Sequence, residues 1–267
     1  MPTYKSVLKR IGRSAAAVLG IDTERDAWKS ALEIAAVLAV SLSATTALAQ
    51  PFYVPSGSMQ PTLAIGDAFI AAKYPYGYSR YSVPFAIGPA SETRLLQQMP
   101  KVGDVIVFRR PTGSTETLVK RVIGLPGDHI QMMSGHLWIN GKELVLTPDG
   151  TGMVEGEDGQ MMRAARFVET LPNGVKHPIF KWTWSGPVDD TPEYVVPAGH
   201  IFVMGDNRDN SLDSRVPSVD GGVGFVPVEN LVGRAEFVVG SYDFLNAHSV
   251  WAWVTEFRPS RFFNSVK

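Results

Sequence analysis

Two short segments of the chain carry residue types suited to hydrolytic chemistry. Residues 55–59 (PSGSM) form a turn-like sequence with two hydroxyl groups, one of them on Ser58. Residues 118–123 (LVKRVI) place Lys120 and Arg121 together inside an apolar run. A serine hydroxyl attacks a carbonyl carbon effectively when a neighbouring base takes its proton. Ser58 and Lys120 are therefore a candidate nucleophile and base, although a Ser-Gly-Ser turn alone is also common in loops without a function.

The pattern of residues 118–123 predicts a β-strand with one basic residue on each face. Lys120 shares its face with two apolar residues, and so does Arg121. We therefore expect at least one of the two charges to be buried. Burial lowers the pKa of a lysine by up to roughly 3–5 units, and a neutral amine can act as a general base, whereas a guanidinium stays charged. The alternative is an edge strand that carries two surface cations.

A third segment, residues 204–215 (MGDNRDNSLDSR), concentrates turn-forming and charged residues directly after an apolar run. This composition predicts a loop with many internal hydrogen bonds. A purely structural turn is the main alternative. A calcium-binding loop is disfavoured because Arg208 stands where an oxygen ligand is expected.

Other common catalytic and metal-binding groups are missing from the sequence or poorly spaced. The chain has no Cys, which excludes thiol catalysis, disulfide bonds and cysteine-ligated zinc. No recognisable catalytic setting or metal-ligand spacing surrounds any of the five histidines (129, 136, 177, 200 and 248). We therefore expect no metal and no cofactor, and serine with lysine is the simplest catalytic pairing.

The elements that must position these residues are predicted to be mainly β-strands. Short β-rich runs are separated by glycine and proline, and Asn140-Gly141 predicts a hairpin turn. Because no helical periodicity follows residue 50, we predict an antiparallel β fold. The expected strands cover residues 104–108, 118–123, 136–140, 200–204 and 235–239. Residues 74–100 and 146–195 are less regular and are interpreted as insertions or a second lobe.

The segment before the β-rich region has the composition of a membrane anchor. No charged residue occurs from Ile34 to Gly66, and the apolar part of this run covers residues 31–49. As a helix, this part would be roughly 28 Å long, close to the hydrocarbon thickness of a bilayer. Basic residues precede it, so we expect the N-terminus in the cytoplasm and the remainder outside. A cleaved signal peptide ending at Ala47-Leu48-Ala49 and a buried soluble helix are the alternatives.

Charge and composition exclude further classes of protein. The 267 residues include 25 Lys and Arg against 26 Asp and Glu, so a basic surface for nucleic acid is not expected. Hydrophobic residues make up 45% of the chain, which argues against wholesale disorder. Residues 246–267 combine aromatic and basic side chains, which suit either a bilayer interface or a packed C-terminal helix.

Taken in order, these segments resemble bacterial type I signal peptidases, the membrane-bound leader peptidases that remove signal peptides from exported proteins. A single membrane anchor precedes the motifs, as in that family. One departure is the stretch 216–223 (VPSVDGGV), where the family commonly passes quickly from DSR to GxVP. The matching sequences are PSGSM with PTL (55–63), KVGDVIVF (101–108), LVKRVIGLPGD (118–128), GDNRDNSLDSR (205–215) and GFVP (224–227).

The resemblance implies a role for each matching residue. Ser58 matches the nucleophile, and Lys120 matches the general base. Ser56 matches a hydroxyl that contributes to the oxyanion hole together with the backbone N–H of Ser58. Ser211 matches the hydroxyl that orients the lysine amine. The supporting residues are Asp213 and Arg215, an acidic–basic pair, with Asp206 and Gly205 of the same motif.

The resemblance also implies a mainly β fold, with an antiparallel catalytic core and an inserted second β-rich lobe, preceded by one transmembrane helix. Expected partners are exported preproteins, cut after small residues (Ala-x-Ala), and membrane lipid, with the catalytic domain on the periplasmic side of the bacterial inner membrane. Another Ser/Lys processing protease and an anchored β domain that binds without cutting are the alternatives. The expected segments are cytoplasmic (1–29), transmembrane (30–50), core (51–128 and 199–245), inserted lobe (129–198) and C-terminal (246–267).

Overall fold

The protein is described by a computed structural model that covers residues 26–82, 94–155, 161–242 and 257–266. The chain divides into two compact units, Met1–Thr45 and Thr46–Lys267. The described part of the first unit is a helix. The second unit consists of three β-sheets with short 3₁₀ turns between the strands. The expected cytoplasmic segment, residues 1–29, lies largely outside the described residues.

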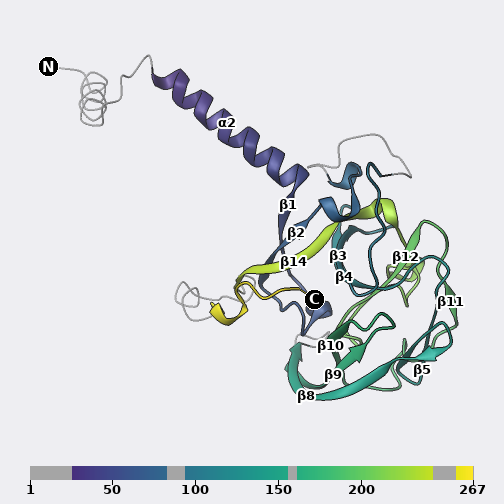
Figure 1. Ribbon diagram of the computed structural model, residues 1–267. Helices are drawn as coiled ribbons and strands as arrows, with labels where there is room; N and C mark the ends of the chain where they lie inside the picture. The colour runs from purple at the N-terminus through teal and green to yellow at the C-terminus, as the bar shows by residue number, and fades with distance from the viewer. Residues whose placement is uncertain (1–25, 83–93, 156–160, 243–256, 267) are drawn as a thin grey trace. The chain divides into compact units, whose positions relative to one another are not determined.

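Helix α2 covers Asp26–Ala47 and contains most of the apolar segment in which a helix is expected (Figure 1). Its apolar side chains are exposed, with 61% of Ile34 and 64% of Val37 accessible. Within the part of the chain that the structure describes, no helix is both long and apolar enough to span a membrane. The helix ends before the expected boundary at residue 50, because Ala49 already belongs to a strand.

A seven-stranded sheet forms the framework of the second unit. Its neighbouring strands are all antiparallel, and the strand that carries Lys120 lies in its interior. Its strand order is β1 (Ala49–Tyr53), β2 (Asp67–Ala72), β14 (Leu231–Ser241), β3 (Val105–Arg109), β4 (Thr117–Gly124), β12 (His200–Met204) and β13 (Val226–Pro227). The prediction of a mainly β, antiparallel fold is confirmed.

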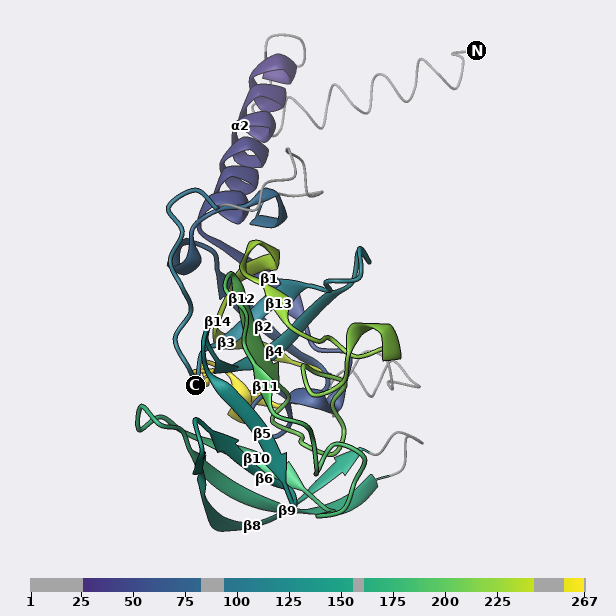
Figure 2. The ribbon, with the colours of Figure 1, turned by 90° about the vertical axis from the view of Figure 1, so that its right-hand side faces the viewer.

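Two smaller sheets are built mainly from the residues between β4 and β12 (Figures 1 and 2). One contains β10 (Lys176–Lys181), β9 (Met161–Thr170) and β8 (Val145–Glu155). The other contains β11 (Tyr194–Val195), β5 (His129–Met133), β6 (His136–Ile139) and β7 (Lys142–Glu143). The predicted turn at Asn140 and Gly141 joins β6 to β7, and both residues have positive φ angles (53° and 74°), as a tight hairpin turn requires.

The interpretation of residues 146–195 as irregular is wrong, because β8, β9 and β10 occupy much of this range. Pro148 and Gly150 interrupt the alternating pattern of β8, and the pairing with β9 shifts register between Pro148 and Thr151. A bulge of this kind lets a strand continue past residues that break its periodicity. The division of the β region into a core and an inserted lobe stays a prediction.

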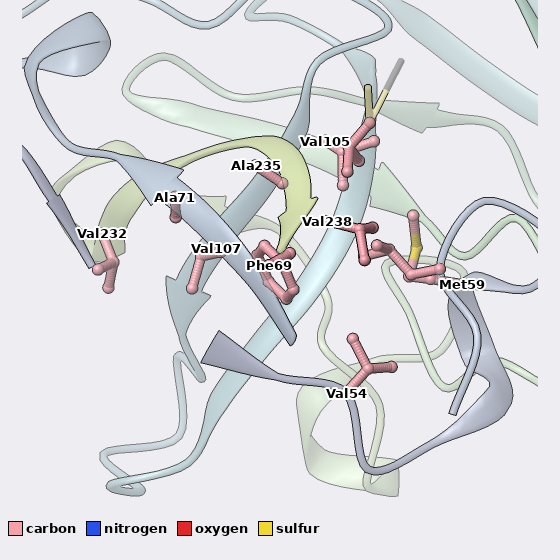
Figure 3. Close-up of a cluster of buried hydrophobic side chains, with 11 residues drawn as sticks. Val54, Met59, Phe69, Ala71, Val105, Val107, Val232, Ala235 and Val238 are labelled. Carbon is pink, nitrogen blue, oxygen red and sulfur yellow. The ribbon is translucent and has the colours of Figure 1, made fainter. Parts of the chain in front are cut away.

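One of the apolar clusters in the second unit lies beneath the turn that carries Ser58. Phe69 of β2, Val105 and Val107 of β3 and Val238 of β14 belong to it, and Met59 packs with them (Figure 3). Met59 is fully buried, so the residue next to Ser58 is fixed in the core. The 3₁₀ turns are η1 (Gly57–Met59), η2 (Tyr74–Tyr76), η3 (Arg80–Ser82), η5 (Ser218–Asp220), η6 (Val228–Asn230) and η7 (Pro259–Arg261).

The described part of the expected C-terminal segment packs on the sheet. Arg261 forms an ion pair with buried Asp67 at 2.5 Å, and Ser265 bridges to Phe237 of β14. Phe263 remains 74% exposed. Among residues 257–266 the helical structure is confined to the turn η7, and the rest of the expected segment, residues 246–256 and 267, lies outside the described residues.

Candidate active site

The turn that carries Ser58 is attached to the loop after β12. The backbone N–H of Asn207 donates a hydrogen bond to the carbonyl oxygen of Ser58 (3.1 Å), and its side-chain amide donates to the carbonyl oxygen of Gly57 (3.1 Å). Met59 fixes the other end of the turn in the core. Ser58 itself is half-buried, so its hydroxyl has a defined position and still faces accessible space.

Lys120 brings the candidate base to this hydroxyl from the interior of the sheet. It lies on β4, between β3 and β12, and only 4% of the residue is exposed. The distance from Lys120 Nζ to Ser58 Oγ is 2.6 Å. At this distance a proton can pass between the two atoms if the amine is neutral. The structure thus brings together two residues that lie far apart in the sequence.

Burial controls the protonation of Lys120. Removal of the amine from water lowers the pKa of Lys120 from 10.5 to about 8. The negative charges of Asp213, Asp206 and Glu116 act in the opposite direction, and the positive charge of Arg215 adds to the lowering. A useful fraction of the amine is therefore neutral near neutral pH, which is the form that a general base requires.

Arg121 is buried on the opposite face of β4. Its guanidinium donates hydrogen bonds to both carboxylate oxygens of Asp206 (2.8 and 2.7 Å) and to the carbonyl oxygen of Gly103 (2.7 Å). Burial alone would raise the pKa of Asp206, but Arg121 holds it well below its usual range. Both basic residues of the strand are thus buried, and the alternative of two surface cations on an edge strand is wrong.

A second ion pair supports the loop after β12. Arg215 Nε and Nη2 donate to the two carboxylate oxygens of Asp213 (2.8 and 2.9 Å), and the N–H of Gly205 donates to the same carboxylate (3.0 Å). A Cβ on Gly205 would lie 2.5 Å from the carbonyl oxygen of Ser58, so the close approach of loop and turn requires glycine here. All of these atoms are buried, which makes the loop a rigid support for Ser58.

Two of the expected site residues have looser connections to the pair. Ser56 is exposed and lines the same cleft as Ser58. Ser211 Oγ is buried and, within the part of the chain that the structure describes, has no hydrogen-bond partner of good geometry, neither Lys120 nor another residue. It does lie near the carboxylate of Asp213, where it helps to keep the pKa of that group low. The structure therefore places Ser211 beside the site without a direct bond to the lysine.

Sequence reasoning missed a buried charge network that reaches the site from β9 and β10. Arg208 donates two hydrogen bonds to Glu169 (2.8 and 2.5 Å). His177 Nε2 lies 3.1 Å from Glu169, and His177 Nδ1 lies 3.4 Å from Asp206. Burial opposes ionisation of Glu169, but Arg208 and His177 lower its pKa to about 2.

The sequence offered only a weak signal for this network. His177 and Glu169 are direct partners across the β9–β10 pair, so the register of two strands creates their contact. These strands fall in the range that the sequence pattern presents as irregular. His177 contacts Asp206 of the loop after β12, so it joins the supporting network rather than the Ser58–Lys120 pair.

The inserted residues 216–223 fold back on the same loop. The backbone N–H groups of Val216 and Val223 both donate to the carbonyl oxygen of Asp213 (3.1 and 3.2 Å). Val223 is buried in the apolar cluster beneath, while Val219 is 90% exposed. The insertion therefore extends outward without displacing Asp213 or Arg215.

Ser58 and Lys120 open into one cleft with a volume of about 1290 Å³. This exceeds the roughly 300–1,000 Å³ of typical small-molecule pockets and suits an extended peptide. Its lining includes Glu116, which directly precedes β4, Leu118 of β4 and Leu212 of the loop after β12. Among the described residues, no group of three or more His, Asp or Glu side chains is arranged to hold a metal ion.

Comparison with known proteins identifies the family. The family model described as "Signal peptidase, peptidase S26" matches residues 27–240. The chain belongs to this family of serine peptidases. A signal peptidase I of Rickettsia typhi is 40% identical over 209 residues, which cover 76% of each protein. A signal peptidase I of Rickettsia akari is 38% identical over 223 residues, covering 81% of this chain and 79% of the relative.

A crystal structure of a signal peptidase I from Enterococcus faecalis is also similar. It shares 26% sequence identity and covers 51% of this chain and 97% of its own, with a TM-score of 0.29. The peptidase S26 assignment agrees with the resemblance that the motifs around Ser58, Lys120 and residues 205–215 indicate.

Proposed function

We propose that this peptidase removes signal peptides from exported preproteins with Ser58 as the nucleophile and Lys120 as the general base. The observation that carries the proposal is the 2.6 Å contact between Ser58 Oγ and a buried lysine amine inside a peptide-sized cleft. Family membership and the names of the Rickettsia relatives support the reaction class. The lowered pKa of Lys120 supplies the neutral amine that the reaction needs.

In the proposed reaction, Ser58 Oγ forms a bond to the scissile carbonyl carbon while its proton moves to Lys120 Nζ. The carbonyl oxygen becomes an oxyanion, which the backbone N–H of Ser58 and the hydroxyl of Ser56 stabilise. Lys120 then gives the proton to the leaving amine as the peptide bond breaks. A water molecule, deprotonated by Lys120, hydrolyses the acyl-enzyme and regenerates the serine.

The remaining site residues act through the pair in this proposal. Asp213 and Arg215 hold the loop that supports Ser58, and Gly205 permits its close approach. Asp206, paired with Arg121, fixes the strand that carries Lys120. We propose that Ser211 orients the lysine amine, because its hydroxyl lies buried beside the site.

We also propose that the substrate carries small residues at the first and third positions before the scissile bond.

A further part of the proposal concerns the membrane. We propose that α2 anchors the enzyme in the bacterial inner membrane, with the catalytic unit on the periplasmic side. The charge-free run from Ile34 to Gly66 and the exposed apolar side chains of α2 support the anchor. Val37→Arg should shift the full-length chain from the membrane fraction to the supernatant, whereas Val37→Leu should not. Retention of Val37→Arg in washed membranes at the wild-type level would contradict the anchor.

The decisive experiment incubates the full-length chain with a preprotein that bears an Ala-x-Ala site and sequences the new N-terminus. Wild type should cut directly after the second Ala, and Ser58→Ala and Lys120→Met should both be inactive. Lys120→Arg should also fail, because a guanidinium stays protonated. Exposed Ser185→Ala and Lys101→Met serve as matched controls and should cut normally. Substantial cleavage by purified Lys120→Met would overturn the Ser/Lys assignment, and no cleavage by wild type would overturn the function.

A further inference from the structure

The cleft that contains Ser58 has an apolar wall contributed by residues outside the seven-stranded sheet. Met162 of β9 and two residues after β10, Trp182 and Val188, line it together with Ser58 and Lys120. Met162 is 37% exposed, and Trp182 is half-buried against a small cluster of buried apolar residues from β8, β9 and β10. An accessible methionine and tryptophan in a catalytic cleft offer apolar contact area that the Ser58 chemistry does not use.

Buried carboxylates hold this wall in place. Asp209 Oδ2 accepts hydrogen bonds from the backbone N–H groups of Trp182 (2.7 Å) and Thr183 (2.9 Å), while Asp209 Oδ1 accepts one from Lys181 Nζ (2.8 Å). Asp189 closes the far end by accepting from the N–H of Gly186 (2.8 Å) and from Lys181. Asp209 belongs to the same loop that fixes Ser58 through Asn207, so the wall has a defined position relative to the nucleophile.

The cleft is larger than two small side chains would fill. Its volume is about 1290 Å³, and its lining extends from Ser58 and Lys120 to Met162, Trp182 and Val188. Methionine adapts to side chains of different shapes, and tryptophan presents a large rigid face. Such a wall fits apolar side chains in general rather than one sequence.

Building on the proposed function, we propose that Met162, Trp182 and Val188 form a subsite for an apolar side chain of the preprotein outside its two small-residue positions. The sheets between β4 and β12 thereby take part in substrate selection. The subsite acts on binding and orientation of the peptide and leaves the Ser58–Lys120 chemistry unchanged.

The test uses the full-length enzyme and a set of peptides with an Ala-x-Ala site. A single leucine is moved one position at a time along an otherwise small and polar sequence, and kcat/KM is measured for each peptide. Wild type should favour one leucine position over serine there by about 10-fold. Met162→Ser and Trp182→Ala should lose this preference while cutting the leucine-free peptide at the wild-type rate.

Two matched controls come from the same sheet and the same loop. Met153 of β8 and Trp184 are also exposed (53% and 41%) but do not line the cleft, so Met153→Ser and Trp184→Ala should retain the preference. Equal loss in controls and cleft variants, or an unchanged preference in Met162→Ser, would overturn the subsite. Failure of wild type to cut even the leucine-free peptide would instead overturn the proposed function.

Discussion

The pKa of Lys120 predicts how activity depends on pH. With a pKa of about 8, the neutral fraction of the amine is roughly 9% at pH 7, from 1/(1 + 10). With the ordinary value of 10.5 it would be roughly 0.03%, so burial raises the neutral fraction of the Lys120 amine by a factor of about 300. Because the neutral fraction grows about 50-fold from pH 6 to pH 8, kcat/KM should rise about 50-fold over the same interval and then level off.

The assay measures kcat/KM for an Ala-x-Ala peptide from about pH 6 to about pH 10, since this ratio reports the free enzyme. Glu116→Gln provides a directional perturbation, because the carboxylate of Glu116 favours the charged form of Lys120 and its removal should move the midpoint to lower pH. Glu193→Gln is the matched control, since Glu193 is a similarly exposed carboxylate that pairs with His129 instead. Its midpoint should equal that of wild type.

A flat profile, or a midpoint near the ordinary lysine pKa of 10.5, would show that a buried Lys120 with a lowered pKa does not control the reaction. A shift of the Glu116→Gln midpoint to higher pH would refute the electrostatic part specifically. Lys120→Met must remove the pH-dependent activity altogether. Residual activity with the wild-type profile in that variant would mean that another group titrates.

Three further predictions concern the oxyanion hole and the buried ion pairs. Ser56→Ala should lower kcat by roughly 10²–10³ with little change in KM, measured by steady-state kinetics, because one oxyanion donor is lost; an unchanged kcat would remove Ser56 from that role. Arg121→Met should reduce the free energy of unfolding in urea by about 3–5 kcal/mol, because buried Asp206 loses its partner, and a change below 1 kcal/mol would show that the pair is not needed for stability. The pKa of Glu169 is about 2 in the folded protein, against an ordinary value of 4.5. As the pH falls, the unfolded chain therefore binds a proton at Glu169 before the folded protein does. The ionised Glu169 side chain contributes its full stabilisation above about pH 4.5, and this stabilisation declines toward pH 2. In acid titrations followed by circular dichroism, Glu169→Gln should therefore show a shallower loss of stability over that range, and a loss as steep as in wild type would contradict this.

The strands that position the site were predictable because their patterns are strong and local. In residues 118–123, each face of the predicted strand carries one basic residue between two apolar ones. The alternation of side chains along a strand was therefore enough to predict that at least one charge is buried. The structure buries both, since β4 is flanked by β3 and β12. The pairing of Ser58 with Lys120 came from the combination of motifs and from the absence of cysteine, and the structure places the two atoms 2.6 Å apart.

The part that could not be predicted depends on contacts between distant strands. Pro148 and Gly150 interrupt the alternating pattern by which the strand β8 could be recognised in the sequence. The strand forms because it pairs with β9 across a bulge. The network of His177, Glu169 and Asp206 joins three elements, and nothing in the local sequence of any one of them specifies the other two. The register between β9 and β10 creates that site, and register depends on the assembled sheet.

The short strand β1 has a further consequence if the enzyme cuts after small residues, as proposed above. The chain itself contains Ala47-Leu48-Ala49, a sequence of the Ala-x-Ala type. Ala49 is paired with Ala72 of β2, and the carbonyl oxygen of Leu48 accepts a hydrogen bond from the N–H of Lys73 (2.9 Å). A peptide must be extended and free of its own sheet to enter a cleft, so cleavage here would require β1 to detach from β2. Under the proposed specificity, this pairing would protect the Ala-x-Ala sequence of the chain from cleavage by the enzyme itself and by neighbouring copies.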